Sequence, residues 1–281
     1  MRRRTFTVEK PSRVEAVLRG ALALARDEAV ALVDRGAVYV DGKRAKDAAA
    51  RVAPGATVMV VLEESGAAVL APVPKPAALV VLYEDADVLA VDKPPGVTAQ
   101  PTAGKVGDSL VDLATAYLRR QAGLVHRLDR ETSGVTIFGK TPRATSALAE
   151  AFRTGRAKKE YLAITGSGLP SSGVIELPLS KDPSRPGRWR ASSTANGISA
   201  QTHFTRLCDN GAVAVVALFP QTGRTHQLRA HLAGIGFPIV GDRLYGGAEG
   251  PRCLLHAHCL EIDELSIEAP VPEELARYGL T

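Results

Sequence analysis

One stretch of seventeen residues, from Gly123 to Gly139, constrains the chain most. Apolar residues stand at both ends of it, Leu124-Val125 on one side and residues 135–138 on the other, around a short polar insert. Two apolar segments around a polar insert predict a strand, a tight exposed turn and a second strand. Polar residues held between two buried strands are a frequent location for function.

Asp129 is the candidate functional residue of this insert. Arg127 and Arg130 flank it, and nearby arginines favour an ionised carboxylate. An ionised carboxylate can act as a nucleophile or as a base. A turn in which Asp and Thr merely satisfy backbone groups would use the same residue types, so the short pattern alone leaves both interpretations open.

The wider string His-Arg-Leu-Asp-x-x-Thr-Ser-Gly, residues 126–134, resembles the signature of the RluA-type pseudouridine synthases. The resemblance implies that Asp129 is the catalytic aspartate. It also implies that Arg127 fills the stack of bases that a flipped uridine leaves. We expect His126 and Arg130 to contact RNA beside it.

Further strings carry the same resemblance. Residues 87–97, with a Lys-Pro-Pro-Gly turn, are similar to the family's first motif, whose implied role is structural. Lys159 and Tyr161 match the next motif, which implies that Tyr161 stacks on the target base and that Lys159 contacts RNA. A core tyrosine of a strand is the alternative for Tyr161.

The most extended similarity covers residues 221–246, with Gln-Thr-Gly-Arg-Thr-His-Gln-Leu-Arg at its start. It implies that Arg224 pairs with the catalytic aspartate, and we assign Arg229 to RNA contact. A turn followed by a helix is predicted here, with Leu228 and Leu232 on one side of the helix.

The first 65 residues predict a small αβ module. Helices are expected at 12–22, capped by Ser12, and at 25–35, followed by a strand into the Asp41-Gly42 turn and a second strand at 57–61. Residues 11–63 resemble the S4 RNA-binding domain. The resemblance implies a face that binds RNA phosphates, with the following candidate contacts: Arg13, Arg26, Arg35, Lys43 and Arg44.

Prolines at alternate positions, Pro72, Pro74 and Pro76, forbid regular structure and predict a stiff spacer. We therefore predict an S4-like domain at 1–65, a linker at 66–78 and a catalytic domain at 79–281. The expected fold class is α+β, because strands are interspersed with single helices. By resemblance, the catalytic domain is a mixed, mostly antiparallel sheet with helices on its faces.

Charge is distributed unevenly. Residues 1–60 hold 12 basic and 7 acidic side chains, residues 119–190 hold 14 and 6, and residues 244–281 hold 2 and 7. Two basic zones indicate a polyanion partner such as RNA, and a mixed, solvated surface is the alternative.

No apolar run reaches about 18 residues, so no membrane span is expected. Three scattered cysteines indicate reduced thiols and a cytoplasmic protein.

No metal or other cofactor is expected. His256, His258 and Cys259 lack the spacing of metal ligands, so the two histidines, on one face of a strand, predict a structural or RNA-facing role. We also expect a monomer.

The chemistry that the resemblance implies, isomerisation of uridine to pseudouridine, oxidises nothing and transfers no phosphate. It requires one ionised carboxylate near the ribose, which either attacks C1′ or removes the C2′ proton.

Two rival functions are weaker. A glycoside hydrolase needs a second carboxylate across the sugar, and Glu131 is too close to Asp129 in sequence to supply it. A non-catalytic RNA-binding function would explain the basic charge, but it would not explain why the chain contains Asp129, Tyr161 and Arg224 together. The sequence therefore predicts an RNA pseudouridine synthase; the S4-like domain favours large-subunit ribosomal RNA, with transfer RNA as the alternative.

Overall fold

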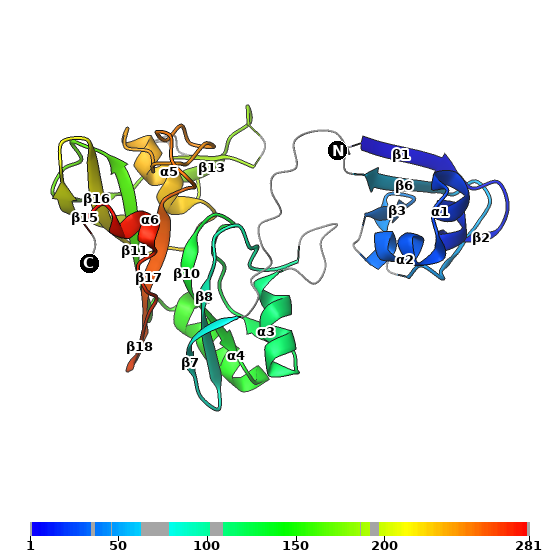
Figure 1. Cartoon of the computed structure of the whole chain (residues 1–281), viewed down its shortest axis with the longest axis horizontal. Helices are drawn as coiled ribbons and strands as arrows, with labels where there is room; N and C mark the ends of the chain where they lie inside the picture. The colour runs from blue at the N-terminus through cyan, green and yellow to red at the C-terminus, as the bar shows by residue number, and fades with distance from the viewer. Residues whose placement is uncertain are drawn as a thin grey trace. The chain divides into compact units, whose positions relative to one another are not determined.

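The computed structural model describes residues 2–34, 37–45, 47–62, 79–101, 109–185, 187–191 and 197–279. The chain divides into two compact units, Met1–Lys75 with Gln100–Leu113, and Pro76–Ala99 with Ala114–Thr281 (Figure 1). The linker predicted at 66–78 lies outside the described residues, so the predicted domain boundaries stay predictions.

The first unit contains a four-stranded antiparallel sheet in the order β1-β6-β3-β4, a separate strand pair and two helices. Its elements are β1 (Arg2–Thr7), β2 (Ser12–Arg13), α1 (Val14–Leu22), α2 (Arg26–Asp34), β3 (Val38–Val40), β4 (Lys43–Arg44), β5 (Arg51–Val52) and β6 (Thr57–Leu62). Both predicted helices are confirmed. Ser12 is not the cap of α1, because its hydroxyl donates to the Lys10 carbonyl and Arg13 occupies the N-cap position.

The amphipathic pattern of α1 explains the core of this unit. Val14 and Leu18 of the helix are buried in one cluster with Val58 and Val60 of β6. Burial of such side chains contributes roughly 1.5–3 kcal/mol each.

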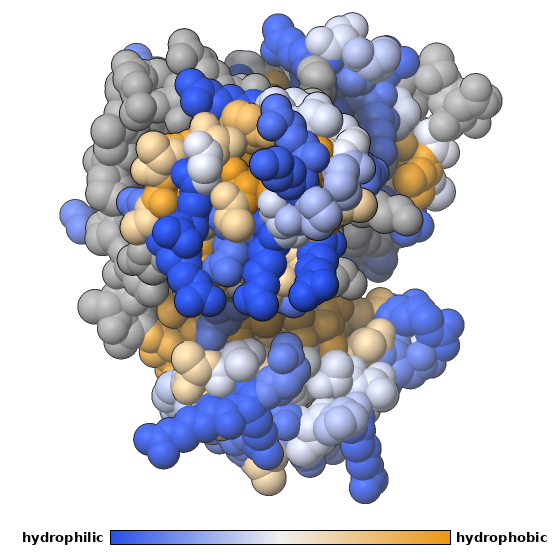
Figure 2. All heavy atoms as spheres, turned by 90° about the vertical axis from the view of Figure 1, so that its right-hand side faces the viewer, coloured by the Kyte–Doolittle hydropathy of each residue, from blue (hydrophilic) through white to orange (hydrophobic). Residues whose placement is uncertain are grey.

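In Figure 2, the face of this unit that is turned to the viewer carries mostly hydrophilic side chains, with smaller apolar areas between them. No helix in the described residues is long and apolar enough to cross a membrane.

The second unit is built on a ten-stranded sheet in the order β12-β15-β16-β11-β17-β10-β8-β7, with β18 beside β17 and β9 beside β10. The strands of this sheet are β7 (Val80–Glu84), β8 (Val88–Lys93), β9 (Gly123–Leu124), β10 (Ser133–Gly139), β11 (Ala157–Gly166), β12 (Ser172–Ile175), β15 (Thr202–Asp209), β16 (Val213–Pro220), β17 (Leu255–Ile262) and β18 (Leu265–Glu268). The remaining elements are α3 (Leu110–Leu118), which the division between the two units cuts after Leu113, α4 (Pro142–Arg153), the hairpin β13 (Leu179–Lys181) with β14 (Trp189–Ala191), α5 (Gln227–Gly234) and α6 (Glu273–Ala276). The expected α+β class is confirmed.

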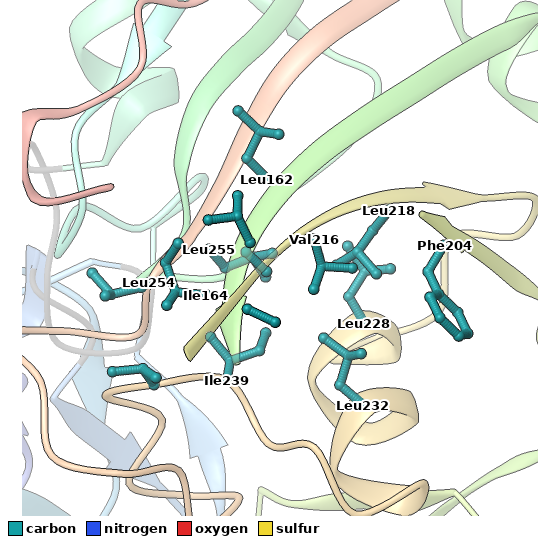
Figure 3. Packing of buried hydrophobic residues seen from close by; sticks show 14 of the residues in the cluster. Leu162, Ile164, Phe204, Val216, Leu218, Leu228, Leu232, Ile239, Leu254 and Leu255 are labelled. Atoms are coloured by element: carbon teal, nitrogen blue, oxygen red, sulfur yellow. The ribbon is translucent and has the colours of Figure 1, made fainter. Parts of the chain in front are cut away.

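Helix α5 packs its leucines onto the sheet. Leu228 and Leu232 lie in one buried cluster with Val216 and Leu218 of β16 and Ile164 of β11 (Figure 3). All six residues of the segment 213–218 are apolar, as expected for a strand that is buried on both faces. This packing fixes the position of the polar residues at the start of α5.

A single parallel pair joins β10 to β17, at Ser133↔His256 and Gly134↔Ala257, whereas every other pairing between the described strands is antiparallel. Gly134 has φ +111°, and a Cβ there would lie 2.1 Å from the Ala257 carbonyl oxygen. Gly134 lies within strand β10, where the close approach of β17 excludes a side chain.

Candidate active site

Asp129 lies in the loop between β9 and β10, and the turn after β8 holds this loop. The Lys93 ammonium donates to the carbonyls of Arg130 (3.1 Å), Val97 (2.8 Å) and Pro94 (3.0 Å). The Gly96 backbone N–H also donates to the Arg130 carbonyl, at 2.8 Å. The Lys-Pro-Pro-Gly turn therefore supports the Asp129 loop, in agreement with a structural role for that motif.

Lys93 is fully buried, and burial lowers its pKa to about 7. The nearby carboxylates of Glu131 and Asp129 act in the opposite direction. Three carbonyl acceptors match the three N–H groups of an ammonium. A buried lysine with such partners ties the backbone at Arg130, next to Asp129, to the turn at 94–97.

Arg229 is the arginine that pairs with Asp129. Its Nη1 lies 3.1 Å from Asp129 Oδ2, while Nε and Nη2 form a bidentate pair with Asp242 at 2.7 and 2.9 Å. The prediction that Arg224 has this role is wrong: Arg224 is exposed, and its Nε donates to the Ser199 carbonyl at 3.2 Å. The assignment of Arg229 to direct RNA contact is also wrong, because its side chain is 9% exposed and occupied by two carboxylates.

The position of Arg229 follows from helix α5, in which residues 227–232 are all buried. Burial alone would lower the pKa of Arg229, but the carboxylates of Asp242 and Asp129 raise it above its usual range. Asp242 also accepts from the backbone N–H groups of Leu244 and Tyr245. An arginine inside a short apolar helix requires carboxylate partners, and this signal could have identified Arg229 in the sequence.

Tyr161 lies on β11, on the other side of β17 from the Asp129 loop. Ala257 of β17 pairs with Gly134 on one side and with Tyr161 on the other, and a bulge at His258 of β17 shifts the register opposite Glu160 and Tyr161. Bulges re-aim side chains next to sites. Burial raises the pKa of Tyr161, and the negative charge of Asp129 raises it further. The structure therefore brings the predicted Tyr161 toward the predicted Asp129.

His226 and Tyr245 complete the surroundings of the carboxylate, and neither was among the predicted site residues. His226 Nε2 lies 3.8 Å from Asp129 Oδ2, and His226 Nδ1 lies 3.1 Å from the Tyr245 phenol oxygen. The Arg229 guanidinium lies over the Tyr245 ring, 5.1 Å from its centroid. Tyr245 follows Asp242 in a loop rich in glycine. Its place beside the carboxylate depends on contacts with His226 and Arg229, which the local sequence does not indicate.

His126 has an internal role, which corrects its assignment to RNA contact. Its Nε2 accepts the Ile137 backbone N–H at 3.0 Å, and its ring stacks on Phe152 at 4.6 Å between centroids. Burial lowers the pKa of His126 to about 3, and the charge of Lys159 acts in the same direction. The neutral ring therefore connects the Asp129 loop to β10 and to α4.

Ser133 and His256 connect the two parallel strands. The Ser133 hydroxyl accepts from Arg252 Nη2 at 3.0 Å, and its oxygen lies 2.9 Å from His256 Nδ1. His256 is fully buried, and burial lowers its pKa to about 4. The structural role is thus confirmed for His256. His258 Nδ1 lies 3.0 Å from the Ala269 carbonyl oxygen.

The other predicted RNA contacts differ in their surroundings. Arg127 and Arg13 are exposed, and Arg130 is exposed with its Nε bonded to the Gly96 carbonyl at 2.9 Å. Lys159 is half-buried, and burial lowers its pKa. Arg35 and the Lys43 side chain lie outside the described residues. Their contacts with RNA stay predictions.

Two comparisons with protein families define the class. The model of the RNA pseudouridylate synthases matches residues 87–234, and that of the S4 domain matches residues 14–58. A catalytic domain of this type beside an S4 module defines an RNA-modifying enzyme. The chain belongs to the RNA pseudouridylate synthase family and is an isomerase of that type.

Relatives and solved structures agree with this membership. The chain is 40% identical over 214 residues to an uncharacterised RNA pseudouridine synthase of Zymomonas mobilis, which covers 71% of this chain and 96% of that protein. It is 36% identical over 250 residues to ribosomal large subunit pseudouridine synthase D of Xanthomonas campestris, covering 78% of this chain and 73% of that protein. Human RNA pseudouridylate synthase domain containing 4 superposes with a TM-score of 0.60 at 27% identity, covering 70% of this chain and 90% of that one.

Proposed function

We propose that this enzyme isomerises specific uridines of large-subunit ribosomal RNA, with Asp129 as its catalytic carboxylate. The observation that carries the chemistry is the Asp129–Arg229 pair on the loop that contains the family's signature. The ribosomal substrate is supported by the relatives named ribosomal large subunit pseudouridine synthase D, such as the Xanthomonas and Xylella proteins.

Asp129 acts on the ribose. The reaction breaks the N1–C1′ bond of uridine, rotates the base and forms the C5–C1′ bond. The Asp129 carboxylate either attacks C1′ or removes the C2′ proton, and both routes need it ionised and aimed. Arg229 supplies both conditions, because a charge-assisted pair favours the carboxylate and its guanidinium is itself fixed by Asp242.

Tyr161 holds the detached base. Its ring stands across β17 from the Asp129 loop, where it can stack on the uracil while the base rotates. Retaining the base keeps the reacting atoms at a high effective concentration. The raised pKa of Tyr161 keeps its hydroxyl protonated near neutral pH, so that it can donate a hydrogen bond.

The uridine must leave its stack before it can reach Asp129, at a cost of a few kcal/mol. Arg127 is exposed two residues before Asp129, and we assign it to the space that the base vacates. Contacts of the S4 domain with phosphates, Arg13 among them, offset part of that cost without reading sequence.

Tritium release from RNA labelled at C5 of uridine tests the chemistry. The wild-type chain is expected to release tritium, and Asp129→Asn is expected to release none while binding the RNA with unchanged affinity. Asn keeps the shape of the side chain and removes its charge. Turnover by the Asn variant would refute the role of Asp129.

Mapping of pseudouridines in RNA from a strain that lacks this protein tests the substrate. Sites that disappear from large-subunit ribosomal RNA, and return with the wild-type gene but not with the Asp129→Asn gene, are the expected result. Loss confined to transfer RNA would overturn the ribosomal assignment and leave the chemistry intact.

A further inference from the structure

The phenol of Tyr245 lies between a backbone amide and a histidine ring. The Trp189 N–H donates to the phenol oxygen at 3.0 Å, and His226 Nδ1 lies 3.1 Å from the same oxygen. A backbone N–H can only donate, so the oxygen is the acceptor toward Trp189. The phenol has one proton to donate, and Nδ1 of His226 is the acceptor that the described residues offer it.

This arrangement sets the tautomer of His226. A ring whose Nδ1 accepts carries its proton on Nε2, which is the nitrogen that lies 3.8 Å from Asp129 Oδ2. His226 occupies the N-cap position of α5 with φ 55°, and its ring faces Asp129. The chain thus places a neutral N–H donor beside the carboxylate.

The charges around His226 agree with a neutral ring. Burial lowers the pKa of His226; Asp129 and Asp242 oppose this shift, and Arg229 adds to it. Burial also raises the pKa of Tyr245 to about 12, so the phenol retains the proton that it donates.

Two groups approach the same oxygen of Asp129, Oδ2. Arg229 Nη1 forms a hydrogen bond with it at 3.1 Å, and His226 Nε2 lies 3.8 Å from it. The second distance is longer than a hydrogen bond, but a small rotation of the carboxylate would shorten it, and catalytic hydrogen bonds often shorten in this way when a substrate binds. Holding one oxygen from two sides leaves Oδ1 as the oxygen to face the ribose.

We propose that His226 is a positioning residue of the reaction: held as its Nε2–H tautomer by Tyr245, it acts with Arg229 to hold Oδ2 of Asp129 and direct Oδ1 at the ribose. This inference rests on the catalytic role of Asp129 proposed above. It adds a second support to the carboxylate, and this support is anchored outside the sheet, in the β13–β14 hairpin that contains Trp189.

Nuclear magnetic resonance of the full chain with ¹⁵N-labelled histidine tests the tautomer directly. The chain has six histidines, and the His226→Gln variant assigns the signal. We expect the wild-type ring to be neutral with its proton on Nε2, and Tyr245→Phe to shift the ring toward the Nδ1–H form. A wild-type ring with its proton on Nδ1 would overturn the proposal.

Single-turnover kinetics test the function of that tautomer. Tyr245→Phe is expected to lower the rate at saturating RNA about tenfold with little change in RNA affinity, the effect of one lost orienting hydrogen bond. Tyr117→Phe is the matched control, because Tyr117 is exposed and its hydroxyl bonds only to Glu84 among the described residues. A tautomer change in Tyr245→Phe without a change of rate would also overturn the proposal.

An NMR titration of the labelled ring separates positioning from simple loss of structure. The phenol donor on Nδ1 favours the neutral ring, so its removal raises the pKa of His226. An unchanged pKa of His226 in Tyr245→Phe contradicts the proposal. If Asp129→Asn were active, the proposed function would fail, whereas the tautomer of His226 would be measured independently.

Discussion

Asp129 and Arg229 are one hundred residues apart in the sequence, and 3.1 Å separates Oδ2 of the first from Nη1 of the second. Asp242 clamps the same guanidinium from the opposite side with two hydrogen bonds. The arginine is therefore shared between a nearly inaccessible carboxylate and a partly exposed one. The partly exposed carboxylate is the one available to a substrate.

Arg229→Gln is expected to lower the rate of isomerisation roughly 100-fold, because the carboxylate loses its charge-assisted partner. It should also destabilise the fold by about 3 kcal/mol, since Asp242 is left as an unpaired buried charge. Adding Asp242→Asn should recover part of the stability and none of the activity, as measured by urea unfolding and tritium release. Arg224→Gln is the control, and a loss of activity there equal to that of Arg229→Gln would contradict the assignment.

Gly134→Ala is expected to destabilise the protein by more than about 3 kcal/mol, since a Cβ would overlap the Ala257 carbonyl in addition to the cost of a positive φ. Gly211→Ala isolates the backbone cost, because φ is +85° there and nothing lies within 4 Å of the added atom. We expect Gly211→Ala to cost about 1 kcal/mol. Equal losses of unfolding free energy in the two variants would exclude a steric role for Gly134.

Lys93→Met removes the donor that three carbonyls share. It keeps a chain of similar length, so most of the loss reflects unsatisfied acceptors, and we expect a destabilisation of roughly 2 kcal/mol. The Asp129 loop should also loosen, which faster amide hydrogen exchange in residues 128–132 would report. Lys158→Met, at an exposed position, is the control. Unchanged exchange in Lys93→Met would show that the loop does not depend on this lysine.

His126 gives the stability a defined pH dependence. Its folded-state pKa is about 3 against an ordinary value of 6.5, so between these values the unfolded chain binds the proton and the folded chain does not. Stability therefore falls as pH drops below 6.5, by about 1.4 kcal/mol per pH unit for this group. Buried His256, with a pKa of about 4, adds a similar slope over a narrower window.

Urea unfolding between pH 7 and pH 4.5 measures this slope. His126→Gln should reduce it, because the amide does not titrate. A slope that is the same in both proteins would mean that His126 is protonated in the folded state.

Local patterns in the sequence predicted most elements closely. The apolar stripe of α1 and the apolar run of β6 determine those elements through neighbouring residues, and both lie within two residues of the predicted ranges. The string around Asp129 identified the candidate carboxylate for the same reason. The tight turn predicted there is longer, because Phe138 pairs with Leu124 and leaves a loop of eight residues, 125–132.

Partners of the carboxylate could not be read from local patterns. Arg224 and Arg229 stand five residues apart in one motif, and the choice between them depends on where α5 begins. The left-handed His226 marks that start, so Arg224 falls in the exposed turn and Arg229 in the buried helix. Asp242 and Tyr245 meet Arg229 only through tertiary packing.

The parallel pair of β10 and β17 has a consequence for assembly of the enzyme. Ser133 and His256 meet although they are 123 positions apart in the sequence, whereas β7 to β8 and β15 to β16 close through short connections. Contacts between distant parts of a chain form slowly, because closing the long loop between them costs entropy before the contact contributes its favourable free energy. We therefore expect catalytic competence to return in the slowest phase of refolding, behind the recovery of secondary structure; simultaneous recovery of both would show that the junction forms early.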